Sequence, residues 1–94
     1  MDATTTGWRD YFLNWPKELP RRGVIVVAFG EQIPFDGFLT TDSLVLVERR
    51  TPDAIGARKV IVPYSQVQAI KLVDVATSKM MRTAGFVGEL PNDK

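Results

Sequence analysis

Any catalytic chemistry in this chain would depend mainly on acidic side chains, because the chain contains neither histidine nor cysteine. Histidine is the commonest general base and the commonest protein ligand for transition metals. Glu31, Asp36 and Asp42 come from three separate positions along one predicted hairpin. A glycosidase-type acid pair or a metal site needs such groups to converge on one point. We therefore expect no enzymatic activity, no metal and no cofactor.

Basic residues cluster around one predicted turn and could bind phosphate. Arg49 and Arg50 leave one strand, and Arg58 and Lys59 enter the next across the segment TPDAIGA, residues 51–57. In an antiparallel hairpin these pairs lie near one another, and arginine forks match phosphate oxygens. The alternative is a solvated hairpin end, or arginines that pair with acidic groups of a neighbouring subunit.

Tyr64 is an aromatic candidate for a nucleic-acid contact, since it follows Pro63 in a predicted loop. A base stacked on such a ring contributes about 1–3 kcal/mol. The alternative is a ring buried at the rim of the sheet, with its hydroxyl group hydrogen-bonded at the edge.

The composition indicates one small domain. The chain has 94 residues, 45% apolar and 24% charged, which is ordinary for a globular protein. A net charge of +1 gives no general attraction to nucleic acid or anionic lipid, so such binding requires a local patch. The N-terminus lacks a signal-peptide pattern, and the longest apolar run, residues 24–29, is too short to span a membrane. We expect a cytoplasmic protein without membrane contact.

Residues 1–20 are predicted to form a lead-in with one short helix. Aromatic residues recur at helical spacing between Gly7 and Pro16: Trp8, Tyr11, Phe12 and Trp15. Thr6 could cap the helix, and Pro16 should end it near Asn14 or Trp15. Such a stripe usually covers a hydrophobic core, and a platform for stacking bases is the rarer alternative.

Residues 21–74 are predicted to form five strands. Apolar and β-branched runs are separated by short turn-like segments, and the strands are placed at 23–29, 33–40, 43–50, 58–64 and 67–74. This spacing is typical of an all-β barrel or sandwich. Strands so continuously apolar, in so small a domain, favour a sheet curled on itself.

The second predicted strand carries a glycine in its middle. Ile33, Phe35 and Leu39 alternate with other residues and should point inward. Gly37 weakens the strand unless the sheet bends sharply there. After the fifth strand, the tail 75–94 has no clear periodicity; residues 78–82, SKMMR, could form a helical turn and the rest should be a loose end.

A short amphipathic helix followed by five bent strands resembles the Sm-like fold, including its bacterial host-factor branch, over residues 6–74. Residues 37–39 look like the family's Gly-x-Leu, and residues 44–46 followed by Glu48 resemble its third strand. Residues 67–70 fit its closing Ile-x-x-Ile pattern. The resemblance implies a small five-stranded barrel with the helix across one open end.

Sm-like proteins are non-enzymatic rings that bind single-stranded RNA with two loops, which here are TTDS, residues 40–43, and PYSQ, residues 63–66. The resemblance makes Asp42, Ser43 and Tyr64 candidate RNA contacts, beside the four basic residues of the hairpin. The loops lack the family's stacking residue and its arginine. Their loss supports a second hypothesis, a structural or protein-interaction module on the same fold.

The resemblance also implies a subunit contact, since in Sm-like rings the fourth strand of one subunit pairs with the fifth strand of the next. Unpaired strand edges invite such pairing. The implied interface is Val60, Ile61 and Val62 against Ile70, Lys71 and Leu72. The expected partners are copies of the chain and, as a candidate, RNA; no small-molecule substrate is expected.

Overall fold

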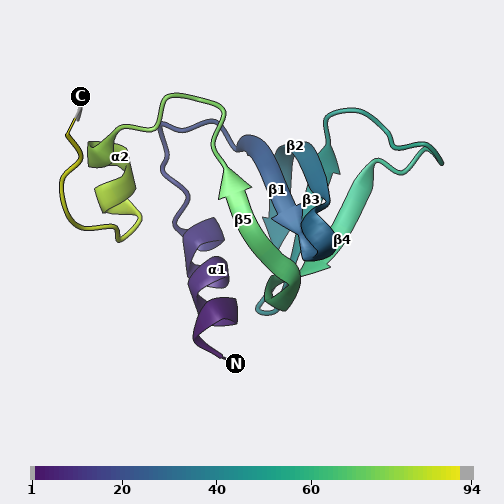
Figure 1. Ribbon diagram of the computed structural model, residues 1–94, viewed down its shortest axis with the longest axis horizontal. Helices are drawn as coiled ribbons and strands as arrows, with labels where there is room; N and C mark the ends of the chain where they lie inside the picture. Colours follow the sequence, from purple (N-terminus) through teal and green to yellow (C-terminus); the bar gives the residue numbers. More distant parts are fainter. Residues whose placement is uncertain (1, 92–94) are drawn as a thin grey trace.

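A five-stranded antiparallel sheet lies at the centre of the structure, a computed structural model that describes residues 2–91 (Figure 1). Its elements in chain order are α1 (Ala3–Leu13), β1 (Arg22–Val27), η1 (Ala28–Gly30), β2 (Gln32–Thr40), β3 (Leu44–Arg49), β4 (Lys59–Pro63), η2 (Tyr64–Gln66), β5 (Val67–Lys71) and α2 (Ser78–Thr83). The strand order is β4-β3-β2-β1-β5. In Figure 1, α1 and α2 lie on the β5 side of the sheet, and the β3–β4 loop projects at the opposite end of the longest axis.

The prediction of a mainly β chain with an N-terminal helix is confirmed. The outermost strands β4 and β5 each pair with one neighbour and not with each other, so the sheet is open. Closure into a barrel therefore stays a prediction. Among residues 2–91 there is no helix with the length and apolar character needed to cross a membrane.

Gly37 interrupts β2 as expected. Its φ of +98° lies in the region that favours glycine, and the β2–β3 register shifts between Phe35 and Phe38. The shift reverses the alternation of side chains beyond it. Phe38, 6% exposed, faces the core and Leu39, 67% exposed, faces solvent. The inward assignment of Leu39 was therefore wrong, whereas Ile33 and Phe35 are buried as expected.

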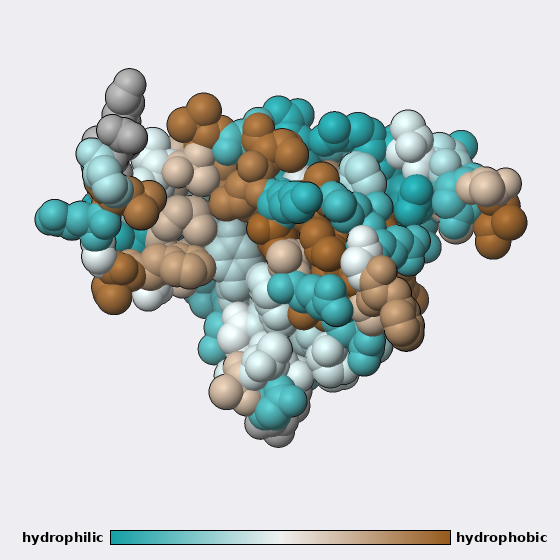
Figure 2. All heavy atoms as spheres, viewed as in Figure 1, coloured by the Kyte–Doolittle hydropathy of each residue, from teal (hydrophilic) through white to brown (hydrophobic). Residues whose placement is uncertain are grey.

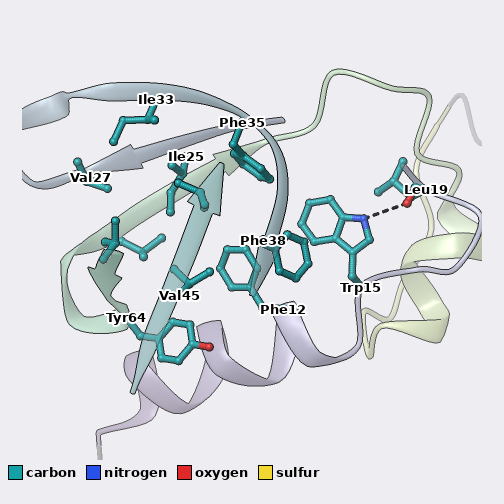
Figure 3. Close-up of a cluster of buried hydrophobic side chains, with 13 residues drawn as sticks. Phe12, Trp15, Leu19, Ile25, Val27, Ile33, Phe35, Phe38, Val45 and Tyr64 are labelled. Atoms are coloured by element: carbon teal, nitrogen blue, oxygen red, sulfur yellow. Dashed lines mark hydrogen bonds between the residues drawn. The ribbon is translucent and has the colours of Figure 1, made fainter. Parts of the chain in front are cut away.

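The helix α1 and the segment that follows it cover the core face of the sheet with aromatic side chains. Phe12 and Trp15 are buried, and their rings lie 4.9 and 5.1 Å from that of Phe38 (Figure 3). The indole N–H of Trp15 donates to the carbonyl oxygen of Leu19 at 3.1 Å, which fixes the segment after the helix. The aromatic stripe is thus part of the core, as the commoner interpretation predicted.

The first helix begins earlier than expected. Asp2, not Thr6, is the N-cap, and its carboxylate accepts a hydrogen bond from the Thr5 backbone N–H at 2.7 Å. That bond holds the pKa of Asp2 below its usual range. The helix ends at Leu13 with Asn14 as its C-cap, in agreement with the stop expected before Pro16.

The first strand is shorter than predicted. It ends at Val27, and Phe29, with φ +65°, lies exposed in the 3-10 turn η1. The backbone N–H of Val27 donates to the Glu31 carbonyl oxygen at 2.9 Å, which closes this tight connection to β2.

The tail contains the expected helical turn, α2, capped by Thr77, whose hydroxyl oxygen accepts from the Met80 N–H at 3.2 Å. Beyond α2 the chain returns to α1, where the ring of Phe86 lies 6.0 Å from that of Tyr11 in an edge-on contact. Residues 92–94 of the predicted tail, and Met1, lie outside the described residues.

Candidate functional site

The TTDS segment is a turn that satisfies its own polar groups. The hydroxyl oxygen of Thr41 accepts from the backbone N–H groups of Ser43 at 3.2 Å and Leu44 at 2.9 Å. The Thr41 N–H donates to the Leu44 carbonyl oxygen at 2.8 Å. Asp42 lies exposed at the tip.

The PYSQ segment contacts this turn directly. The backbone N–H of Tyr64 donates to the Ser43 carbonyl oxygen at 3.1 Å, and its hydroxyl donates to the Thr41 carbonyl oxygen at 3.1 Å. We call residues 40–43 and 63–66 together the loop pair. The two loops that the Sm-like resemblance assigns to RNA binding therefore lie side by side.

Tyr64 is 0% exposed, so its ring cannot stack on a base. The ring packs 6.1 Å from that of Phe12, on the core side of the loop pair (Figure 3). Burial raises the pKa of the Tyr64 hydroxyl, with a further contribution from Asp42 and an opposing one from Arg9. Of the two interpretations of Tyr64, the buried ring at the rim of the sheet is the one the structure bears out.

Arg9 is a basic residue near the loop pair that sequence reasoning missed. The helix α1 packs against η2, and Arg9 lies close enough to Tyr64 for its charge to affect the hydroxyl. Its guanidinium forms a 3.3 Å ion pair with Asp10. A signal was present in the sequence, because Arg9 lies three residues before the buried Phe12 and so on nearly the same helix face.

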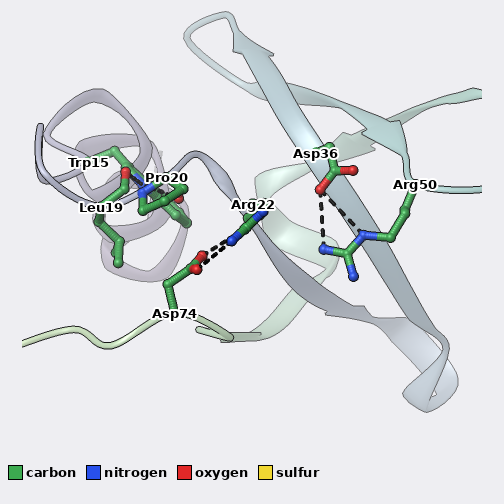
Figure 4. A network of polar contacts seen from close by, with 7 residues as sticks. All are labelled: Trp15, Leu19, Pro20, Arg22, Asp36, Arg50 and Asp74. Atoms are coloured by element: carbon green, nitrogen blue, oxygen red, sulfur yellow. Dashed lines mark hydrogen bonds and ion pairs between the residues drawn. The ribbon is translucent and has the colours of Figure 1, made fainter.

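The basic hairpin contains two pairs of basic residues. Arg49 and Arg58 lie on neighbouring segments of the hairpin, whereas Arg50 and Lys59 each form an ion pair with an acidic side chain. The Arg49 N–H donates to the Arg58 carbonyl oxygen at 2.6 Å, which places the backbones of these residues opposite each other where the β3–β4 loop begins and ends. The Arg49 Nε–H donates to the Thr51 carbonyl oxygen at 3.0 Å. Arg50 forms a 3.2 Å ion pair with Asp36 (Figure 4), and Lys59 forms a 2.8 Å ion pair with Glu48.

The loop between these strands is held by Asp53. Its carboxylate accepts from the backbone N–H groups of Ala57 at 2.8 Å and Ile55 at 3.0 Å. These bonds, that from Ala57 above all, lower the pKa of Asp53, and the charge of Arg49 adds to the effect. The side chain of Arg58 makes no hydrogen bond or ion pair within residues 2–91.

The structure does not bring the two sets of candidate RNA contacts together. Lys59 begins β4 and Pro63 ends it, so the basic hairpin and the loop pair lie at opposite ends of this strand. At about 3.3 Å per residue the separation along the strand is roughly 15 Å. Figure 1 shows the β3–β4 loop at the far end of the hairpin from η2.

Two other arginines near the helix exit serve the fold. The guanidinium of Arg22 binds Asp74 through two hydrogen bonds of 2.9 and 2.7 Å (Figure 4). Arg21 lies 3.8 Å above the ring of Phe38 and donates to the carbonyl oxygen of the same residue at 2.9 Å. Within residues 2–91, no three acidic side chains are grouped so that they could hold a metal ion.

The free edge of β4 exposes the backbone of Ile61. The N–H of Tyr64 bonds to the carbonyl of Ser43 on the β3 side, and hydrogen-bonded pairs alternate along an antiparallel ladder. Val60 and Val62 therefore bond to β3. The N–H and C=O groups of Ile61 point away from the sheet.

The free edge of β5 exposes the backbone of Ile70. The N–H of Val27 donates to Glu31, on the β2 side of β1, so by the same alternation Val26 bonds to β5, where its partner is Ala69. Lys71 likewise bonds to β1. Of the residues expected at a subunit interface, Ile61 and Ile70 thus carry the free backbone groups within the two edge strands.

Comparisons of the chain with protein-family models, with curated proteins and with solved structures found no match. The Sm-like resemblance therefore rests on the sequence alone.

Proposed function

We propose that this chain is a non-enzymatic, Sm-like subunit that associates with copies of itself into a ring through β4 and β5. The observation that carries the proposal is the open sheet, whose two outer strands each have one edge without a strand partner among residues 2–91. Such edges invite a further strand. Because the two edges have different sequences, the contact between copies is head-to-tail, and it closes into a ring when the rotation allows.

The chemistry of the β4 edge supports this proposal. Natural proteins protect free edges with charges, proline, bulges or covering segments. β4 has Lys59 at its start and Pro63 at its end, but its centre is Ile61, 61% exposed. An apolar residue at the centre of a free strand edge is better suited to an interface than to solvent.

The test is the molar mass in solution, measured by light scattering at micromolar concentration. We expect a homo-oligomer for the wild type. Ile61→Pro removes the N–H that points away from the sheet and should lower the mass to that of the monomer. Gln68→Pro, within β5, should disturb the assembly less.

Circular dichroism on each variant separates loss of assembly from loss of folding. A wild-type monomer at this concentration contradicts the proposal.

Single-stranded RNA is a second candidate, and the facing pair Arg49 and Arg58 is the observation that favours it. Their backbones form a hydrogen-bonded pair, so both side chains leave the same face of the hairpin, and like charges directly opposite each other on neighbouring strands are destabilising. A phosphate group between them would relieve that repulsion and satisfy their donors. Multivalency in a ring would strengthen a contact that is weak in one subunit.

Fluorescence titration with oligo-U and oligo-A at two salt concentrations tests RNA binding. Replacing Arg49 and Arg58 by alanine should reduce the log–log salt slope by roughly 0.7 per subunit, because the pair would neutralise one phosphate group and each such contact contributes about 0.7. The matched control replaces Arg50 and Lys59, whose charges Asp36 and Glu48 already neutralise, and should change the slope less.

If RNA binding is absent at low salt, or if both double variants change the salt slope equally, RNA binding by the basic hairpin is ruled out. The remaining proposal is then a structural or protein-interaction role. The self-satisfied TTDS turn and the buried Tyr64 ring support that alternative.

A further inference from the structure

An apolar groove runs beside the free edge of β5. It has a volume of about 400 Å³ and lies between α1, β5 and the tail. Trp8 and Tyr11 line it from the helix, Ile70 from β5, Leu72 from just beyond the end of β5, and Phe86 from the tail. Figure 1 shows α1 next to β5 on this side of the sheet, with α2 beyond it.

An exposed apolar side chain of matching size lies at the other edge of the sheet. Leu39, Leu46 and Ile61 form one row across β2, β3 and β4 on the outer face, and Ile61 ends that row at the free edge. Ile61 thus combines an exposed side chain with backbone groups that have no partner in the sheet.

The side chains of the two edges point to opposite faces of the sheet. Ile70 lies directly opposite the buried Ile25, so its side chain is on the core face, where the groove is. Ile61 lies between Val60 and the buried Val62 on β4, so its side chain is on the outer face.

Antiparallel pairing of these edges has a fixed geometric consequence. Two residues that exchange backbone hydrogen bonds across an antiparallel pair carry their side chains on the same side. If Ile61 of one copy bonds to Ile70 of another, the outer face of the first copy must continue into the core face of the second. The Ile61 side chain then enters the groove.

We propose that Ile61 of one copy fills the groove between α1 and β5 of the next copy. The inference rests on the proposed assembly through β4 and β5, and it adds the residue that makes the contact specific. The helix and the tail become part of the interface, because they supply the walls of the groove.

Cross-linking between two variants tests this contact, and the absence of native cysteine leaves a clean background. Gly7 lies on the groove side of α1, and a Cβ there would meet no atom within 4 Å. Unlabelled Ile61→Cys is mixed with ¹⁵N-labelled Gly7→Cys and treated with a short bismaleimide. Mass spectrometry then distinguishes the mixed dimer from dimers of either variant alone.

Leu39→Cys is the matched control for Ile61→Cys. Leu39 is 67% exposed and belongs to the same row on the outer face, but it lies two strands away from the edge. We expect the mixed dimer from Ile61→Cys with Gly7→Cys and none from Leu39→Cys with Gly7→Cys. Equal yields from both pairs, or no link from Ile61→Cys in a sample that is assembled, would overturn the inference.

Association measured by dilution gives a second readout that needs no cysteine. Ile61→Ala should weaken association by roughly 10-fold or more, since several buried methyl and methylene groups are lost at the contact, whereas Leu39→Ala should leave it unchanged. Assembly that is indifferent to Ile61→Ala overturns the groove contact and leaves the ring intact. A wild-type monomer in light scattering overturns both.

Discussion

Tyr11 carries a hydroxyl group that is buried and has no hydrogen-bond partner within residues 2–91. Burial raises the pKa of this hydroxyl. A buried donor without a partner costs about 1–3 kcal/mol. Tyr11→Phe keeps the ring contacts with Trp15 and Phe86 and removes that cost. We expect it to raise the free energy of unfolding by about 1 kcal/mol in urea titrations.

Tyr64→Phe is the matched control, because the Tyr64 hydroxyl has a partner in the Thr41 carbonyl oxygen. The same chemical change at that position should lower the free energy of unfolding by about 1 kcal/mol. Two variants that change stability in the same direction would show that the Tyr11 hydroxyl is bonded in solution.

At the scale of single elements, Gly23 of β1 lies against the backbone of β5 with no room for a side chain. A Cβ at this position would lie 2.6 Å from the Lys71 carbonyl oxygen, which belongs to the backbone and cannot rotate away. Gly23→Ala should therefore force the strands apart and cost about 1–3 kcal/mol in thermal or urea unfolding.

Gly7→Ala is the control, and it should raise the free energy of unfolding instead of lowering it. Its Cβ would point into open space on a helix, where alanine is favoured over glycine by about 0.8–1 kcal/mol. A neutral Gly23→Ala would mean that β5 can move away from β1 at little cost.

The strands themselves were predictable because apolar runs alternate with turn residues along the chain. Which face of the sheet the side chains beyond Gly37 occupy was not predictable, because a sequence does not say how many residues a bulge adds to one strand. Leu39 was misplaced for that reason. The helix start was misassigned because Asp2 and Thr6 are both good caps, and only the structure shows which one accepts the bond.

The candidate site, too, was predictable only in part. That Arg49 and Arg58 face each other follows from a hairpin with a turn between them. The neutralisation of Arg50 by Asp36 does not follow, because these residues are 14 positions apart and meet only through the β2–β3 register, which shifts between Phe35 and Phe38. Burial of Tyr64 was one of two open interpretations, and it depends on the helix passing over η2.

At the scale of the whole molecule, the free energy of unfolding should fall in acid and stay constant near neutral pH. Asp2, Asp53 and Asp74 have folded-state pKa values below the usual range, Asp74 mainly through its hydrogen bonds to Arg22. An unfolded aspartate titrates near pH 4. The stability these groups contribute is present above that pH and is lost as the pH falls through their lower folded values.

Because the chain has no histidine, no side chain with an unperturbed pKa titrates between pH 5 and 8. We expect urea midpoints that are flat over this range and that fall below about pH 4. Asp74→Asn should make the acid decline shallower. A transition centred between pH 6 and 7 would contradict this account.

The placement of the loop pair and the basic hairpin at opposite ends of β4 has a consequence for any ring built head-to-tail. Rotation about one axis carries every copy into the next without turning it over, so all the β3–β4 loops emerge on one side. Such a particle has a front and a back. If β4 runs along the ring axis, one face carries Ile55 and Arg58, whose side chain has no partner within residues 2–91, and the other carries the closed turn at Asp42. A binding partner that distinguishes the two would always approach from the same direction.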